Sequence, residues 1–243
     1  MTKHLFLYCF ILNSLVCLAQ RDNLEVEYSI SLIDEKDMYG NIMFYNGVLK
    51  TDNKISLFRL TTKDTLIDSE LFGSFENHSP NFEKIFYKDL GNSKLYYKEK
   101  RGLKTPKIIK DDVKISWTYT TETTVIDGVL CNKAYCNFRG RDYEAFYDTS
   151  IKFKDGPFKF SGLPGLIVKI NSLDGAVKIK TNLITYTPES ITKNPFDGLT
   201  DVISFSDYKK EYLKYFKRMT GYRADLDSET FVPKRSIEYL VDE

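Results

Sequence analysis

The sequence predicts a mainly β protein: a strongly curved antiparallel sheet or open half-barrel with one amphipathic helix near the C-terminus. Three observations predict this fold class. Apolar and polar residues alternate with a period of two along many short segments, Gly, Asn and Asp stand between those segments, and aromatic residues make up 14% of the 243 residues. Neither a repeat nor an interdomain linker interrupts the pattern, so residues 20–243 are expected to form a single domain.

Residues 1–19 have the pattern of a secretory signal peptide. A basic start at Lys3 precedes an unbroken apolar run over residues 5–12, and the small residues Cys17 and Ala19 fit a signal-peptidase site. The run is too short for a membrane-spanning helix. The residue before Cys17 is not the small one that a lipobox requires, so cleavage is favoured over a lipoprotein or a buried N-terminal helix. We therefore expect an exported protein, in the periplasm or associated with the outer membrane.

Removing residues 1–19 takes away one lysine and no acid, so the net charge falls from +1 to zero. A neutral chain offers no electrostatic footprint for nucleic acid. Cys131 and Cys136 remain, and in one extended strand they would lie roughly 16 Å apart, beyond the disulfide limit of about 7 Å. Two buried thiols are therefore expected, because a disulfide would need a turn or bulge at Asn132 and Lys133. No metal site is expected from this pair.

The strands follow in order along the chain. In the first half, strands are expected over residues 26–32, 48–49, 55–60, 82–88, 95–98 and 115–126, with turns at 52–53, 91–92 and 127–128. In the second half, they are expected over residues 134–138, 142–148, 166–171 and 177–186, with turns at 139–141 and 174–175. Short turns between successive strands favour an antiparallel meander.

One helix is expected over residues 206–221. Ser206 is a suitable N-cap, Asp207 suits the first turn, and Gly221 supplies a stop. The apolar positions fall on one stripe: Tyr208, Tyr212, Tyr215, Phe216 and Met219. We expect this stripe to pack on the sheet rather than to bind a partner helix.

A run of short motifs lies between Trp117 and Ile170. It includes Gly-Arg at 140–141, Glu-Ala-Phe-Tyr-Asp at 144–148 and Asp-Gly-Pro-Phe-Lys-Phe-Ser ahead of the hexapeptide Gly-Leu-Pro-Gly-Leu-Ile at 162–167. With these spacings the segment resembles the GLPGLI family of exported Bacteroidota proteins. Phe146 stands where that family usually has Trp. The resemblance implies an exported β protein often encoded near outer-membrane receptors, and it implies no settled activity.

The motif itself is expected to be structural, with a ligand loop as the alternative. Its residues are Gly156, Pro157, Gly162, Leu163, Pro164, Gly165, Leu166 and Ile167. The glycines permit a positive φ, Pro164 fixes φ, and the aliphatic residues anchor the turn in the core. No Gly-Lys-Ser/Thr follows, as a phosphate loop requires, and no Ser stands at the centre, as a nucleophile elbow requires.

Few residues in the sequence form a pattern that is typical of a catalytic site. His78 is the one histidine outside residues 1–19, and a solvated loop position is expected for it rather than a Ser-His-acid site. Asp142, Glu144 and Asp148 share one strand face by period two, which a hydrolase with paired carboxylates would need. A solvated outer face is the favoured interpretation of these three acids. No cofactor is expected.

Binding residues are suggested by the same hairpin. Arg139 and Arg141 could bind an anion, and Tyr143, Phe146 and Tyr147 could line a concave groove for apolar or peptide cargo, although core packing is favoured for the aromatics. We expect a noncatalytic cell-envelope accessory or binding protein acting with an outer-membrane transporter or barrel protein. The alternatives are a periplasmic hydrolase using the strand carboxylates and a purely structural envelope component.

Overall fold

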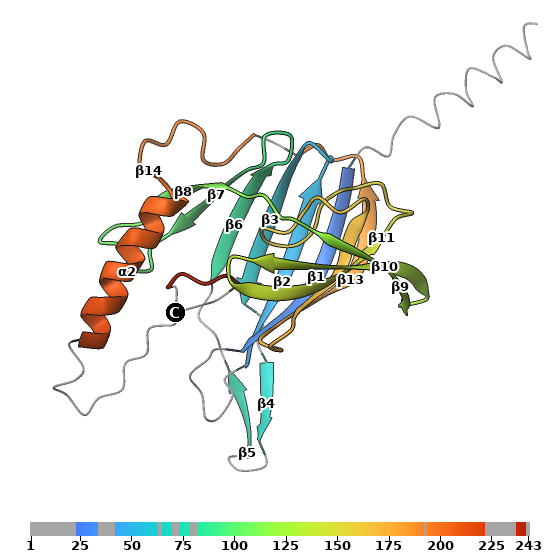
Figure 1. Ribbon diagram of the computed structural model, residues 1–243, viewed down its shortest axis with the longest axis horizontal. Helices are drawn as coiled ribbons and strands as arrows, with labels where there is room; N and C mark the ends of the chain where they lie inside the picture. Colours follow the sequence, from blue (N-terminus) through green and yellow to red (C-terminus); the bar gives the residue numbers. More distant parts are fainter. Residues whose placement is uncertain are drawn as a thin grey trace, which may run out of the picture.

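A computed structural model describes residues 23–33, 42–62, 65–69, 73–77, 82–191, 193–221 and 237–241. The expected signal peptide and His78 lie outside these residues. Within them the protein is mainly β, with a 12-stranded sheet, a separate β4–β5 hairpin and the helix α2 (Figure 1). The two end strands of the large sheet, β14 and β9, do not pair with each other, so the curved sheet stays open. The expected fold class is confirmed.

The sheet is an antiparallel meander with one parallel addition. Its order is β14-β8-β7-β6-β3-β2-β1-β13-β12-β11-β10-β9. The strands are β1 (Asn23–Ile33), β2 (Ile42–Thr51), β3 (Ile55–Thr62), β4 (Thr65–Ser69), β5 (Gly73–Asn77), β6 (Glu83–Asp89), β7 (Lys94–Glu99), β8 (Lys107–Asp112), β9 (Thr118–Ile126), β10 (Val129–Phe138), β11 (Arg141–Asp148), β12 (Leu166–Ser172), β13 (Val177–Thr187) and β14 (Val202–Ser204). Only β14 pairs in parallel, with β8. The long β1–β13 pairing joins the two halves of the sheet.

Local turn chemistry fixes the hairpins. Asp127 and Gly128 have φ of 49° and 82°, and Arg139 and Gly140 have φ of 49° and 94°. Both central residues of each two-residue turn thus have a positive φ, and turns of this type match the twist of the flanking strands. The expected hairpins at these places are confirmed. The expected strand over 115–126 begins later, at Thr118, and Arg141 already belongs to β11.

The helix α2 (Phe205–Gly221) begins earlier than expected and has a different cap. The Ser204 hydroxyl accepts a hydrogen bond from the Asp207 backbone N–H at 3.0 Å, so Ser204 rather than Ser206 is the N-cap. Tyr208 and Tyr212 of the apolar stripe are buried, and α2 lies beside β8 and β14. The stripe therefore packs at one edge of the sheet, as expected.

The concave side of the sheet is filled by the chain itself. Phe158 packs against Phe58 of β3, with ring centroids 4.9 Å apart, and Phe160 packs against Tyr143 of β11 at the same distance. Phe158 and Phe160 belong to residues 154–165, a segment that links β11 to β12 and crosses the inner face (Figure 1). The described C-terminal residues 237–241 lie on the same side. Most of the aromatic side chains among the described residues are therefore buried.

Candidate functional site

Residues 154–165 form a compact loop held by its own backbone. The N–H of Gly162 donates to the carbonyl of Lys154 at 2.9 Å, and the N–H of Ile167 donates to the carbonyl of Asp155 at 3.0 Å. The indole Nε1 of Trp117 donates to the carbonyl of Ser161 at 2.9 Å. These bonds fix the path that the sequence encodes between Gly156 and Gly165.

The glycines of this loop are placed where larger residues do not fit. Gly162 has φ of +94°. A Cβ on Gly165 would lie 2.2 Å from the backbone oxygen of Asp148, and one on Gly156 would lie 2.8 Å from the Cβ of Ile167. The other motif residues divide by exposure: Pro157, Leu163, Leu166 and Ile167 are buried, and Pro164 is exposed. The motif thus anchors the loop in the core.

A buried ion pair attaches this loop to β6. The Lys88 ammonium contacts the Asp155 carboxylate and donates to the carbonyl of Gly156 at 2.6 Å. The Lys88 and Asp155 side chains are 4% and 0% exposed. Burial lowers the pKa of Lys88, and the nearby Asp155 charge opposes that shift. Each of the two buried side chains is therefore the ion-pair partner of the other.

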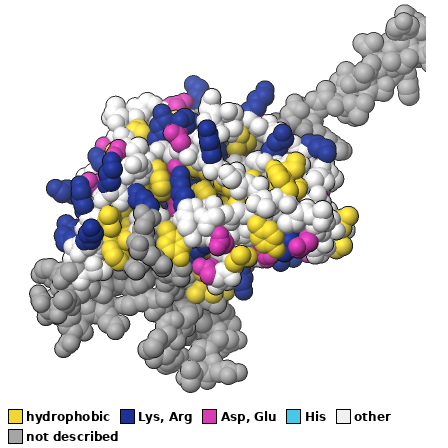
Figure 2. Space-filling model, in the orientation of Figure 1, with side chains coloured by type: hydrophobic (Ala, Val, Ile, Leu, Met, Phe, Trp, Pro, Cys, Tyr) yellow, Lys and Arg dark blue, Asp and Glu magenta, His cyan; other side chains and the backbone are white. Residues whose placement is uncertain are grey.

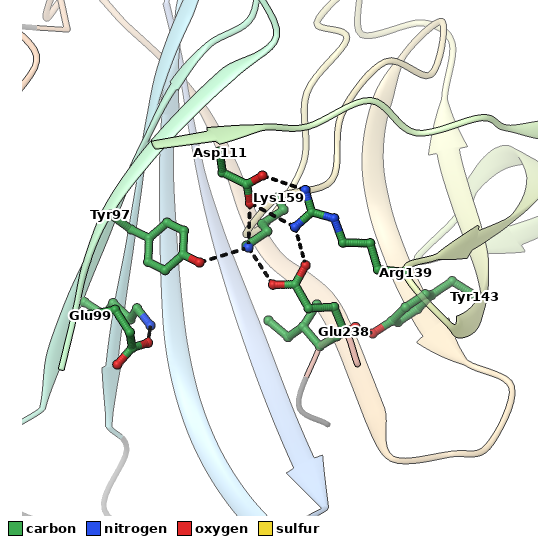
Figure 3. A network of polar contacts seen from close by, with 9 residues as sticks. Tyr97, Glu99, Asp111, Arg139, Tyr143, Lys159 and Glu238 are labelled. Atoms are coloured by element: carbon green, nitrogen blue, oxygen red, sulfur yellow. Dashed lines mark hydrogen bonds and ion pairs between the residues drawn. The ribbon is translucent and has the colours of Figure 1, made fainter. Parts of the chain in front are cut away.

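Four charged side chains from distant parts of the chain meet on the concave side, and we call them the ionic cluster. They are Asp111 of β8, Arg139 of the β10–β11 turn, Lys159 of the loop 154–165 and Glu238 of the C-terminal segment 237–241 (Figure 3). In the order of the sheet, β8 and β10 are each next to an end strand. The cluster therefore joins the two ends of the open sheet.

The ionic cluster is a closed ring of alternating charge. The Lys159 ammonium lies 2.8 Å from Asp111 Oδ2 and 2.5 Å from Glu238 Oε1. The Arg139 guanidinium lies 2.5 Å from Asp111 Oδ1 and 2.6 Å from Glu238 Oε2. Two cations thus share two carboxylates, and the ring is neutral overall. Arg139 also lies over the Phe205 ring, 3.8 Å from its centroid.

The environment of the cluster favours the charged forms of Asp111 and Arg139. Burial alone would raise the pKa of Asp111, but Lys159 and Arg139 outweigh it and hold that pKa below its usual value. Burial alone would lower the pKa of Arg139, but the two carboxylates raise it. Burial, followed by the Glu238 and Asp111 charges, raises the pKa of the adjacent Tyr97. Each of these shifts follows from burial together with the charges of the cluster.

The C-terminal segment 237–241 is also held next to this cluster by hydrogen bonds that its backbone makes. The Tyr239 N–H donates to the carbonyl of Arg139 at 3.0 Å, and the Tyr143 hydroxyl donates to the carbonyl of Ile237 at 2.5 Å. Gly140, with φ of +94°, lies against the Tyr239 ring, where a Cβ would come within 2.8 Å. The segment is thus held by its backbone, one carboxylate, one ring and the buried side chains of Ile237, Leu240 and Val241.

A cavity of about 180 Å³ remains between this segment and the sheet. Its apolar wall includes Leu32, Leu60, Phe82, Phe86 and Phe158. Its polar wall includes Lys84, Glu99 and Arg101, with Lys84 Nζ 2.6 Å from Glu99 Oε2. Burial lowers the pKa of Lys84, and Glu99 opposes the shift. The cavity therefore combines an aromatic surface with excess positive charge.

A second groove lies between α2 and β8. It measures about 650 Å³ and is lined by Leu103, Ile203 and Tyr215 with Lys104, Lys107 and Arg218 at its sides. Figure 2 shows Lys and Arg side chains gathered over this end of the molecule. Lys107 is paired with Asp201, which lowers the net charge of the groove.

The binding residues expected from the sequence are only partly brought together. Arg139 and Tyr143 contact the C-terminal segment. Arg141 instead pairs with Asp174 at 3.2 Å, and Phe146 lies between the ammonium groups of Lys133 and Lys169. Tyr147 is buried and pairs in register with Asn132 and Ile167.

The strand acids have no partner in common. Asp142 is exposed and accepts from the Asn137 amide, whereas Glu144 accepts from Asn171 and pairs with Lys133. Asp148 is buried rather than solvated, and its carboxylate accepts a hydrogen bond from the Ser150 N–H at 2.7 Å. The expectation of one solvated face is therefore wrong for Asp148, which caps the turn after β11.

The cysteines are two buried free thiols, as expected. A register shift of β10 against β9 between Asn132 and Ala134 allows Cys131 and Ala134 both to face inward. Burial raises the pKa of Cys136 to about 12. Among the described residues, no group of three or more His, Cys, Asp and Glu is placed to hold a metal ion, and no helix has the length and apolarity to cross a membrane.

Sequence reasoning missed three members of the ionic cluster. Lys159 had a usable signal, because a lysine between Phe158 and Phe160 must either leave the core or find a counter-ion inside it. Asp111 and Glu238 had none, since their partners are 28 to 99 residues away.

Comparison with known proteins gives structural similarity alone. No family model matches the chain, and no curated protein matches it. Two solved structures of PNGF-II are similar, with TM-scores of 0.49 and 0.44 and identities of 15% and 16%. In each case the match covers 82% of this chain and 34% of the other, so the chain spans about a third of the length of those structures.

Proposed function

We propose that this is an exported, noncatalytic binding protein of the cell envelope, related to the GLPGLI family. Its concave side would hold an extended peptide segment of a partner, such as an outer-membrane barrel protein. The sequence support is the signal-like segment 1–19 and the hexapeptide 162–167. The structural support is the surface that the ionic cluster and the β10–β11 turn present to residues 237–241, which we call the seat.

One observation carries the proposal: the concave side already contains a short segment that belongs to no strand, residues 237–241. Its contacts are a backbone N–H bond at Tyr239, a hydroxyl bond to the carbonyl of Ile237 and a carboxylate shared by two cations. Such backbone-plus-anchor contacts are typical of peptide recognition. The cluster pairs two cations with two carboxylates, so each carboxylate already has cationic partners, which suits holding a ligand.

The experiment is capture of the full-length, tagged protein from its own envelope with crosslinking before solubilisation. We expect a mature chain beginning near Gln20 in the envelope fraction, bound to a barrel protein. The matched variant Arg139→Met removes a cation from the seat and should reduce capture. A chain that keeps Met1 in the cytoplasm, or capture unchanged by Arg139→Met, would contradict the proposal.

A further inference from the structure

The charge of the seat depends on the C-terminal segment. Without Glu238 the cluster would contain Arg139 and Lys159 against the single carboxylate of Asp111. With residues 237–241 in place, the Lys159 and Asp111 side chains are 4% and 0% exposed and the Arg139 side chain is 25% exposed. A charge shielded from water is unfavourable without a partner. The site therefore favours a carboxylate at the position of Glu238.

The contacts of residues 237–241 are those of a bound ligand rather than of a sheet strand. The segment belongs to none of the strands of the large sheet. It meets the β10–β11 hairpin through Arg139, Gly140 and Tyr143. Two backbone groups and the Glu238 carboxylate are recognised, and Ile237, Leu240 and Val241 are buried, so the site calls for a carboxylate flanked by apolar side chains.

The segment also leaves its seat incompletely filled. Ile237, Glu238 and Leu240 form one wall of the cavity of about 180 Å³. Protein interiors are close-packed and leave few voids larger than a water molecule, which occupies roughly 30 Å³ of liquid. The remaining space has room for a large apolar side chain against Phe82, Phe86 and Phe158. The lining has three cations, Lys84, Arg101 and Lys159, and two carboxylates, Glu99 and Glu238, so it carries one excess positive charge.

We infer that the concave side is a binding site for a short acidic peptide, and that the chain's own segment 237–241 occupies it in cis. The ligand places a Glu or Asp carboxylate on Arg139 and Lys159, and a larger apolar side chain near it enters the cavity. This inference rests on the proposed function and specifies the ligand class of its site. A ligand in trans competes with Glu238 for the same two cations.

The test uses a fluorescent peptide with the sequence of residues 235–243 and the full-length protein. Glu238→Gln weakens the segment in cis, so the variant should bind this peptide at least about 10-fold more tightly than the wild type. The same peptide with Gln in place of its first Glu should bind the variant about 10-fold more weakly. Glu83→Gln, at an exposed ion pair, is the matched control and should bind like the wild type.

Leu240→Ala weakens the seated segment without changing its charge and should also increase peptide binding, which covers the case that Glu238→Gln fails to fold. The inference is overturned if neither variant binds the peptide saturably, or if the Glu and Gln peptides bind equally. Envelope capture that persists while peptide binding fails would overturn this ligand class and leave the proposed function standing. Capture that excess peptide blocks would support both.

Discussion

Gly165 has the least room for a side chain of the described glycines. An added Cβ would lie 2.2 Å from the backbone oxygen of Asp148 and 2.7 Å from its carbonyl carbon. Backbone atoms cannot rotate aside as a side-chain end can, so β11 and the following loop would have to separate. Space, rather than φ, is therefore the constraint at this position.

Gly165→Ala is accordingly expected to lower the free energy of unfolding by about 1–3 kcal/mol or more, as overpacking does. Denaturant unfolding measures the change. Gly91→Ala is the control, because the nearest atom to its added Cβ is a side-chain oxygen of Asp89 at 3.6 Å. Equal stability of the two variants would show that the close approach at Gly165 does not exist.

The ionisation of Asp111 makes the free energy of unfolding depend on pH. Because Lys159 and Arg139 hold its pKa below the usual value of about 3.9, its contribution to stability is complete above that value and disappears as pH falls through the lower folded pKa. The free energy of unfolding should therefore decline below about pH 4. Asp111→Asn should be less stable at pH 7 and decline less steeply.

Asp112→Asn is the matched control for that titration. The Asp112 side chain is 67% exposed, whereas that of Asp111 is fully buried. Its unfolding curve against pH should follow the wild type. An Asp111→Asn profile as steep as that of the wild type would contradict the role given to Asp111.

At the scale of elements, the loop 154–165 is attached to the sheet by the Lys88–Asp155 pair. Removing one member of a buried pair leaves the other charge uncompensated, so Lys88→Met is expected to cost about 3–5 kcal/mol. The double variant Lys88→Met, Asp155→Leu removes both charges and should be more stable than Lys88→Met alone. Urea unfolding of the three chains gives the comparison, and a double variant less stable than the single one would refute this attachment.

The elements differ in how far the sequence predicted them. Turns at Asp127 and Gly128, and at Arg139 and Gly140, follow from local chemistry, so the hairpins around them were predictable. β8 was not identified, because its sequence Lys-Ile-Ile-Lys-Asp-Asp does not alternate with period two. β14 was missed because it is short and pairs in parallel with β8, far away in sequence.

The candidate site was less predictable because, like the pairing of β14 with β8, it depends on residues far apart in sequence. Arg139 and Tyr143 were identified as binding residues from their hairpin, but their partners come from β8, the loop 154–165 and residues 237–241. Asp148 was misplaced because the pairing of β11 with β12 shifts register between Phe146 and Tyr147, so strict alternation does not continue to the end of the strand. Long-range ion pairs leave no local pattern, except where a charge such as Lys159 interrupts an apolar run.

At the scale of the whole molecule, the ionic cluster closes an open sheet. Asp111 lies one strand from the β14 end, and Arg139 adjoins β10, one strand from the β9 end. Glu238 of the C-terminal segment completes the connection between them. A segment that replaces Glu238 would therefore act on both ends of the sheet at once.

The most direct test is a double-mutant cycle on Arg139 and Glu238, using Arg139→Met, Glu238→Gln and the double variant. The free energy of unfolding should give a coupling energy of about 1.5 kcal/mol or more, as for close, desolvated charge pairs. The pair Arg59 and Glu83 has the same 2.6 Å separation but is about half exposed, and should give about 0.2–1 kcal/mol. A coupling at Arg139 and Glu238 no larger than at this exposed pair would contradict a C-terminal segment seated on the ionic cluster.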